Sequence, residues 1–180
     1  MKDGAKSLNA KQKGDPFDET RMLELIQGVI ADKSGVLPLA RGLSYVGEHA
    51  AAWLTLGLAG MLVDGKRRTQ WGILTGAAFG SHAASVVVKR IVRRPRPHGP
   101  RVRIGVKTPS QLSFPSSHAT STTAAMVQLA RIVGSPVPLA VIPLMMLSRM
   151  TVGVHYPTDV AAGALLGGLS AEAVHRAITK

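Results

Sequence analysis

The sequence contains no cysteine, and this absence excludes several kinds of site at once. Without thiols there is no disulfide framework, no thiolate nucleophile and no cysteine-based metal site. Aromatic residues are also scarce, at 4% of the 180 residues. A nucleic-acid-binding protein would place its basic residues on a soluble helix or among stacking aromatics. We therefore expect no nucleic-acid partner.

Acidic residues are few as well, with 10 Asp and Glu against 22 Lys and Arg and a formal net charge of +12. Such a charge suits nucleic acid, an anionic lipid surface or a phosphate group. Residues 1–21 are polar and have no apolar core behind the early lysines, so no signal peptide is visible. We expect residues 1–20 to form a flexible polar tail and residues 21–180 to form a single domain.

Apolar residues make up 46% of the chain, and its 19 glycines lie mostly inside the apolar stretches. Glycine costs up to about 1 kcal/mol relative to alanine in a water-exposed helix, but it is common in membrane helices, which it allows to approach closely. The apolar segments are 49–63, 70–88, 119–133, 137–152 and 160–178. Several are shorter than the roughly 20 residues that span a hydrocarbon core, so their polar ends must extend them. The pattern predicts an all-α polytopic membrane helix bundle with about five transmembrane helices.

An amphipathic segment precedes these stretches. Between Met22 and Ala31, apolar residues recur at helical spacing, opposite polar positions such as Glu24 and Gln27. This pattern predicts an N-terminal amphipathic helix that lies in the membrane interface. The alternative is that residues 22–46 cross the membrane and provide a sixth span.

Three short polar strings stand at the ends of the apolar segments: KRIVRRPRP at 89–97, PSSH at 115–118 and SRMTVGVHYPTD at 148–159. With five crossings, the connections that carry them all emerge on the same side of the membrane. We therefore expect the three strings to converge on one membrane face, although they are far apart in the sequence.

The first string is cationic. Lys89 ends an apolar segment, and Arg96 lies between two prolines that hold a stiff, non-helical backbone. Arginine presents a planar fork to two phosphate oxygens, and lysine adds a compact point charge. For the remaining arginines of this loop we favour a positive-inside role or contact with lipid headgroups; they are Arg90, Arg93, Arg94, Arg101 and Arg103.

The second string opens a helix. Pro115 suits a helix start, so Ser116, Ser117 and His118 fall in the first turn, where free backbone N–H groups form an anion site. His118 can exchange a proton near neutrality, because histidine has an unperturbed pKa of about 6.5. Alone, this string would be a serine cap with an incidental histidine.

The third string carries a histidine and a carboxylate. Asp159 falls in the first turn of the last helix, from which it can accept a hydrogen bond from one nitrogen of His155 and direct the other nitrogen at phosphorus. Arg149 would join Lys89 and Arg96 as a third cation that binds the phosphate. The sequence leaves open the roles of two further histidines near these strings. His82 is either functional or a contact between helices, and His98 is a candidate contact for a substrate headgroup.

The three strings resemble the signature of the type 2 phosphatidic acid phosphatase superfamily, which reads KxxxxxxRP, PSGH and SRxxxxxHxxxD. One fixed position departs from it, since Ser117 replaces the usual glycine. The resemblance implies a helical bundle shared with vanadium haloperoxidases, a mechanism without metal or cofactor, and a covalent phosphohistidine. It assigns His155 as nucleophile, Asp159 as its orienting partner and His118 as general acid. It assigns phosphate binding to Lys89, Arg96, Ser116, Ser117 and Arg149.

The resemblance also implies a membrane lipid phosphatase, with a phosphorylated lipid and the bilayer as partners. The segment around 108–125 and the GEH at 47–49 are similar to actinobacterial enzymes that dephosphorylate decaprenylphosphoryl phosphoribose for cell-wall arabinan synthesis. The alternatives are a phosphatase of undecaprenyl diphosphate, phosphatidate or phosphatidylglycerophosphate, a lipid phosphotransferase and, remotely, a vanadate-dependent haloperoxidase. With five spans, most lysines and arginines lie on the side of the strings, so the positive-inside rule favours a cytoplasmic site; a sixth span would place it outside.

Overall fold

The computed structural model describes residues 15–180, and the regular elements of this part of the chain are helices. The α-helices are α1 (Glu19–Ile30), α2 (Val36–Val46), α3 (Ala51–Val63), α4 (Arg68–Val92), α5 (Ser117–Val133), α6 (Val141–Thr151) and α7 (Pro157–Thr179). Three short 3₁₀ helices join them: η1 (Glu48–Ala50), η2 (Gly65–Arg67) and η3 (Val137–Ala140). The predicted all-α fold is confirmed. Of the predicted polar tail, residues 1–14 lie outside the described part.

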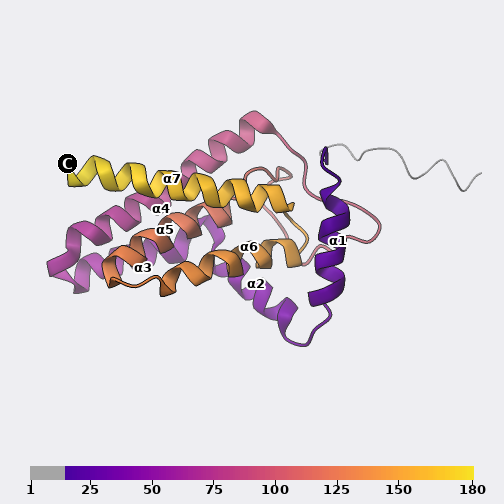
Figure 1. The fold of residues 1–180 in the computed structure, drawn as a ribbon, viewed down its shortest axis with the longest axis horizontal. Helices are drawn as coiled ribbons and strands as arrows, with labels where there is room; N and C mark the ends of the chain where they lie inside the picture. Colours follow the sequence, from indigo (N-terminus) through magenta and orange to yellow (C-terminus); the bar gives the residue numbers. More distant parts are fainter. Residues whose placement is uncertain (1–14) are drawn as a thin grey trace, which may run out of the picture.

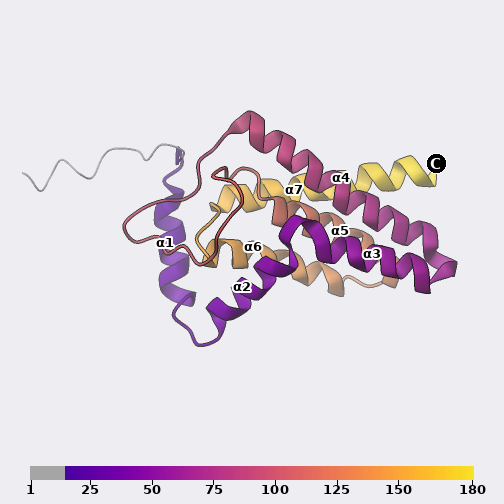
Figure 2. The same ribbon diagram turned by 180° about the vertical axis from the view of Figure 1, so that it is seen from behind.

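Helices α3 to α7 run alongside one another, and α1 lies across one end of this bundle (Figures 1 and 2). Each of the five predicted apolar segments forms a helix, and the polar strings stand where those helices begin or end. The end that α1 covers also carries the long connection from α4 to α5; we call it the site end. The opposite end, where α3 turns into α4 and α5 into α6, is called the far end.

The length and hydropathy of the helices bear on membrane crossing. Gly65–Val92, with 28 residues, is long and apolar enough to cross a membrane. Val36–Val46 and Glu48–Val63 pass the same test as a pair, bent by 49° at their junction. Residues 22–46 thus form two separate helices, of which the second leads into α3. The number of membrane crossings stays a prediction.

Helices α5 and α7 approach each other closely because α7 carries two glycines four residues apart on the facing side. A Cβ atom at Gly167 would lie 2.2 Å from the carbonyl oxygen of Thr120, and one at Gly163 would lie 2.7 Å from that of Ser116. Small residues at this spacing allow two helix backbones to pack tightly. The contact holds the beginnings of α5 and α7 together, where the backbone N–H of Ser116 donates to the carbonyl of Asp159 at 2.9 Å.

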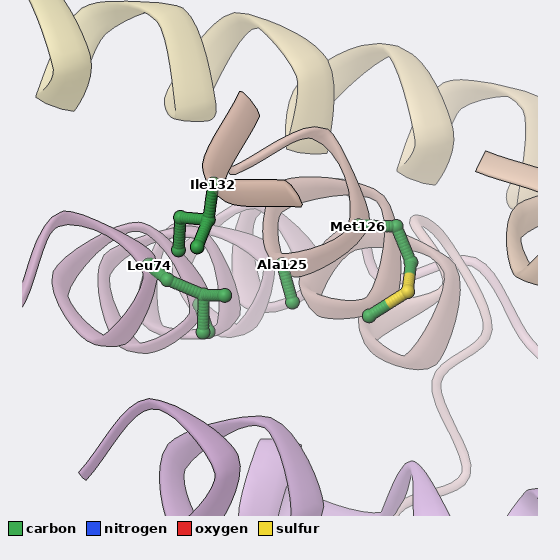
Figure 3. Close-up of a cluster of buried hydrophobic side chains, with 5 residues drawn as sticks. Leu74, Ala125, Met126 and Ile132 are labelled. Atoms are coloured by element: carbon green, nitrogen blue, oxygen red, sulfur yellow. The ribbon is translucent and has the colours of Figure 1, made fainter. Parts of the chain in front are cut away.

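The apolar core between α4 and α5 is small. Leu74, Ala125, Met126 and Ile132 form its centre (Figure 3). Many other large apolar side chains lie on the outside; examples are Leu62 at 80%, Phe79 at 64% and Leu165 at 66% exposure. An apolar exterior of this kind suits contact with lipid.

Candidate active site

The three polar strings meet around one cavity of about 660 Å³ at the site end. Six of the eight predicted site residues line it: Lys89, Arg96, Ser117, His118, Arg149 and His155. The other two, Ser116 and Asp159, are fully buried and are not among the lining residues. The predicted convergence of the strings therefore appears in the structure as a shared cavity with two supporting residues in the packed interior.

His155 lies between a carboxylate and a cation. It occupies the turn after α6, and its Nδ1 is 3.5 Å from Asp159 Oδ2, in the first turn of α7, without forming a hydrogen bond. Its other nitrogen, Nε2, lies 3.4 Å from Arg96 Nη1. Catalytic hydrogen bonds are often long in unliganded sites and tighten when substrate binds. The arrangement directs Nδ1 at the carboxylate and Nε2 at a group that binds anions.

The protonation state of His155 follows from its surroundings. Burial lowers the pKa of His155 well below its usual value, and the positive charges of Arg96, Arg149 and Lys89 lower it further. The imidazole is therefore neutral near pH 7 and keeps a lone pair on one nitrogen. A neutral ring is the form that can act as a nucleophile.

Backbone carbonyls fix two of the cations. Lys89 Nζ donates to the carbonyls of Ser113 at 3.1 Å and Pro115 at 2.8 Å, just before α5 begins. Arg96 donates from Nε to the carbonyl of Ser110 at 2.7 Å and from Nη1 to that of Val154 at 2.8 Å. Burial lowers the pKa of Arg96 to about 10, so it still carries its charge near neutrality. Cations held in this way need little rearrangement when an anion arrives.

Arg149 and His118 share a partner on α2 that the sequence did not reveal. Arg149 Nη1 donates to the hydroxyl of Ser44, and its buried Nε has no hydrogen-bond partner among residues 15–180. His118 Nε2 lies 2.9 Å from the carbonyl oxygen of Ser44. Because a carbonyl can only accept, Nε2 must carry the proton, which leaves Nδ1 free to exchange one. The end of α2 packs closely here: a Cβ at Gly47 would lie 2.7 Å from the His118 ring.

The two serines of the second string have different surroundings. Ser116 caps α5, since its hydroxyl accepts from the backbone N–H of Ala119 at 3.4 Å. Ser117 lines the cavity, and its hydroxyl lies 2.8 Å from that of Ser85 on α4. The position where the superfamily signature has glycine is thus the serine that faces the cavity.

Arg94 contacts other side chains of the protein, whereas the sequence favoured a positive-inside role or contact with lipid headgroups. Its guanidinium donates to Asp159 Oδ1 at 2.9 Å and to Glu19 Oε2 at 2.6 Å, and it stacks 4.0 Å from the centre of the Tyr156 ring. No local pattern distinguishes Arg94 from its neighbours, because these contacts join residues 65 and 75 positions apart. Arg103 also contacts protein, through Asp32 and the carbonyl of Gln27. Arg90, Arg93 and Arg101 are exposed.

Of the other histidines, His82 and His49 line the cavity and His98 does not. His82 lines the cavity, and its ring centre lies 6.1 Å from that of His49, which lines it too. His98 is exposed, does not line the cavity, and places Nδ1 3.0 Å from the carbonyl of Arg96. In the part of the chain that the structure describes, no three His, Asp or Glu side chains gather as metal ligands would.

Comparison with known proteins gives consistent matches. The PAP2 superfamily model matches residues 70–180. Two relatives carry the name decaprenylphosphoryl-5-phosphoribose phosphatase. The one from Mycobacterium tuberculosis is 48% identical over 152 residues, which cover 84% of this chain and 86% of the relative. The one from Mycolicibacterium smegmatis is 51% identical over 148 residues and covers 82% of each chain.

Two solved structures share the fold. Aquifex aeolicus LpxE has a TM-score of 0.70 and 18% identity, and the match covers 87% of this chain and 93% of that one. A transmembrane PAP2-type phosphatidylglycerolphosphate phosphatase from Bacillus subtilis has a TM-score of 0.68 and 22% identity, covering 87% and 84%. At these identities the likeness establishes the helical architecture alone.

Proposed function

This chain belongs to the PAP2 superfamily and is a membrane lipid phosphatase, and from that premise we propose that His155 accepts the phosphoryl group from a lipid phosphate monoester. The observation that carries this proposal is the position of a neutral His155 between Asp159 and Arg96, at the wall of the cavity. A carboxylate behind one nitrogen and a cation beside the other suit an imidazole that attacks an anionic phosphorus centre.

The proposed reaction has two steps. His118 first takes up a proton at Nδ1 from the bound phosphate monoester. His155 Nε2 then forms a bond to phosphorus while the bond from phosphorus to the ester oxygen breaks, and His118 gives that oxygen the proton from Nδ1. Water then attacks the phosphohistidine, His118 takes a proton from the water, and inorganic phosphate leaves as the bond to Nε2 breaks. Asp159 orients His155 throughout. Phosphoryl transfer depends mainly on such positioning and on stabilisation of charge.

The phosphate itself would lie among three cations and a helix start. Lys89, Arg96 and Arg149 line the cavity and would face its oxygens, as would Ser117 in the first turn of α5. The N-terminus of a helix favours an anion because its backbone N–H groups are free. Ser116 supports this site by capping α5, which fixes the direction of those groups.

For the substrate, we propose decaprenylphosphoryl phosphoribose, with loss of its 5-phosphate. Two relatives that cover more than four fifths of this chain are named for that activity. Such a lipid carries two phosphates, the monoester that leaves and the phosphodiester that stays. The cavity offers cations for both, since exposed Arg41, Arg90 and Lys107 line it in addition to the buried ones.

We propose further that the chain crosses the membrane several times, with α1 in the interface. Helix α1 turns polar residues toward the protein, where Glu19 and Gln27 are buried. It turns apolar residues outward: Met22 is 54%, Leu25 63% and Val29 64% exposed. A helix with this orientation can lie on the acyl boundary of a bilayer while its polar side contacts the bundle.

A panel of phosphorylated lipids tests the activity and the substrate. Purified protein in detergent, with chelator present, is given decaprenylphosphoryl 5-phosphoribose, undecaprenyl diphosphate, phosphatidate or phosphatidylglycerophosphate, and released inorganic phosphate is measured. We expect the ribose lipid to have the highest kcat/KM and vanadate to inhibit its hydrolysis. A higher kcat/KM for another lipid would overturn the substrate proposal and leave the phosphatase in place.

The same assay tests the nucleophile. His155→Ala is expected to lower kcat by about 10⁴-fold or more, because no other group replaces the covalent step. The matched control is His175→Ala, which removes a histidine from α7 outside the cavity and should leave kcat unchanged. Near-normal turnover by a folded His155→Ala variant would refute the assignment.

A further inference from the structure

Arg94 joins three elements on the side of Asp159 that faces away from the cavity. It follows the end of α4, its side chain is only 9% exposed, and it does not line the cavity. Its Nη1 donates to Asp159 Oδ1 at 2.9 Å and to the Thr158 hydroxyl at 2.7 Å, and its Nη2 donates to Glu19 Oε2 at 2.6 Å. The guanidinium thus links the start of α7 to α1.

The two oxygens of Asp159 have separate donors. Oδ2 accepts from the backbone N–H of Tyr156 at 2.8 Å and faces His155, whereas Oδ1 accepts from Arg94. A buried carboxylate without an opposite charge is costly, and a single hydrogen bond leaves it free to rotate. Arg94 forms the ion pair with this carboxylate and anchors Oδ1. Ser113 adds a further side-chain hydrogen bond, and Lys89 and Arg96 add more distant positive charges. Because Arg94 makes the direct charged contact with Oδ1, it contributes most to how the carboxylate meets His155.

Glu19 in turn holds Arg94 and the start of α7. Its Oε1 accepts from the backbone N–H of Thr158 at 2.7 Å, and its Oε2 is 2.7 Å from the Thr158 hydroxyl and 2.6 Å from Arg94. Asp15 fixes the beginning of α1 by accepting from the backbone N–H groups of Glu19 and Thr20 at 2.7 and 2.8 Å. A carboxylate from α1 therefore accepts a hydrogen bond from one of the free backbone N–H groups in the first turn of the helix that carries Asp159.

We propose that Arg94 is a positioning residue that sets the orientation of Asp159 toward His155, and that Glu19 holds Arg94 in place, which makes α1 a part of the catalytic apparatus. The inference rests on the proposed role of His155 as the nucleophile. It predicts that loss of Arg94 slows the chemical step and leaves lipid binding nearly unchanged, because the side chain has no contact with the cavity.

The test compares Arg94→Gln, Arg94→Lys and Glu19→Gln, with inorganic phosphate release from the panel lipid that the wild type hydrolyses fastest. Arg94→Gln is expected to lower kcat roughly 10- to 100-fold, as loss of a charge-assisted hydrogen bond to a buried group does. KM should stay within about twofold. Arg94→Lys keeps the charge and should recover part of kcat, and Glu19→Gln should lower kcat about 3- to 10-fold.

Arg93→Gln is the matched control, since Arg93 is exposed and adjacent in the sequence, and it should retain the wild-type kcat. Unfolding temperatures in detergent identify variants that are merely unstable. If Arg94→Gln does not fold, Glu19→Gln decides the outcome. A folded variant of either residue with wild-type kcat would overturn the positioning role, and a KM effect with unchanged kcat would do the same. An active His155→Ala variant would instead refute the proposed nucleophile.

Discussion

The two ends of the bundle are built differently, although the same helices supply both. At the far end the connections are short, and the ion pair of Arg131 with Glu172 is 38% exposed on both sides. At the site end the connection from α4 to α5 is long, and Arg149 in the last turn of α6 is only 2% exposed. Both arginines stand in the last turn of a helix, yet one is solvated and the other is buried.

This difference shows where in the fold the chain tolerates contacts that are unfavourable for its stability. A surface ion pair contributes little to stability and is easily exchanged. A buried cation with an unpaired nitrogen is costly, and the Arg149 Nε is such a group among the described residues. Burial of several cations around one cavity is explained by an anionic ligand and not by stability. The far end has the polar contacts of a scaffold, and the site end has those of a binding site.

The largest effect expected from this comparison is on phosphate release. Arg149→Gln removes a buried charge that faces the cavity, so kcat/KM should fall about 100-fold or more. Arg131→Gln changes the same residue type at the far end and should leave kcat/KM unchanged. The assay measures inorganic phosphate from the preferred panel lipid. An equal loss in both variants would remove the distinction between the two ends.

A smaller effect on activity is expected from disturbing the packing of α5 against α7, two helices that run from one end of the bundle to the other. Gly167→Ala places a methyl group against the carbonyl of Thr120, which should cost about 1 to 3 kcal/mol of stability through overpacking. Activity should fall with it, because the contact aligns the starts of both helices. The neighbour Gly168 has nothing within 4 Å of an added Cβ, so Gly168→Ala should be neutral. Unfolding temperature in detergent and kcat test the pair, and equal behaviour would contradict tight α5–α7 packing.

The sequence predicted the helical segments well, because apolar runs and their polar ends are local patterns. It also predicted that the residues of three strings would meet, since alternating crossings bring their connections to one side. Lys89 at the end of an apolar segment and Arg96 between two prolines could be singled out from the neighbouring arginines by their position, and the resemblance to a known signature agrees with that choice. The structure adds that backbone carbonyls hold both of them.

The contacts that the sequence could not predict are long-range. Ser44 reaches Arg149 across 105 positions, and Glu19 reaches Arg94 across 75. Neither residue belongs to a motif, and α1 looked only like an interfacial helix. Its amphipathic pattern was read correctly, but nothing in that pattern says which partners its polar side binds. Arg94 and Arg96 each precede a proline in the sequence, but Arg94 contacts Asp159 whereas Arg96 lies beside Nε2 of His155.

The central claim is that the phosphoryl group passes through His155. Purified protein is mixed rapidly with the preferred lipid, quenched in alkali to preserve phosphohistidine, digested and measured by mass spectrometry. We predict one added phosphoryl group on the peptide that contains His155 in the wild type, and none in His155→Ala. A phosphoryl group on another residue, or phosphate release by His155→Ala at the wild-type rate, would contradict the account.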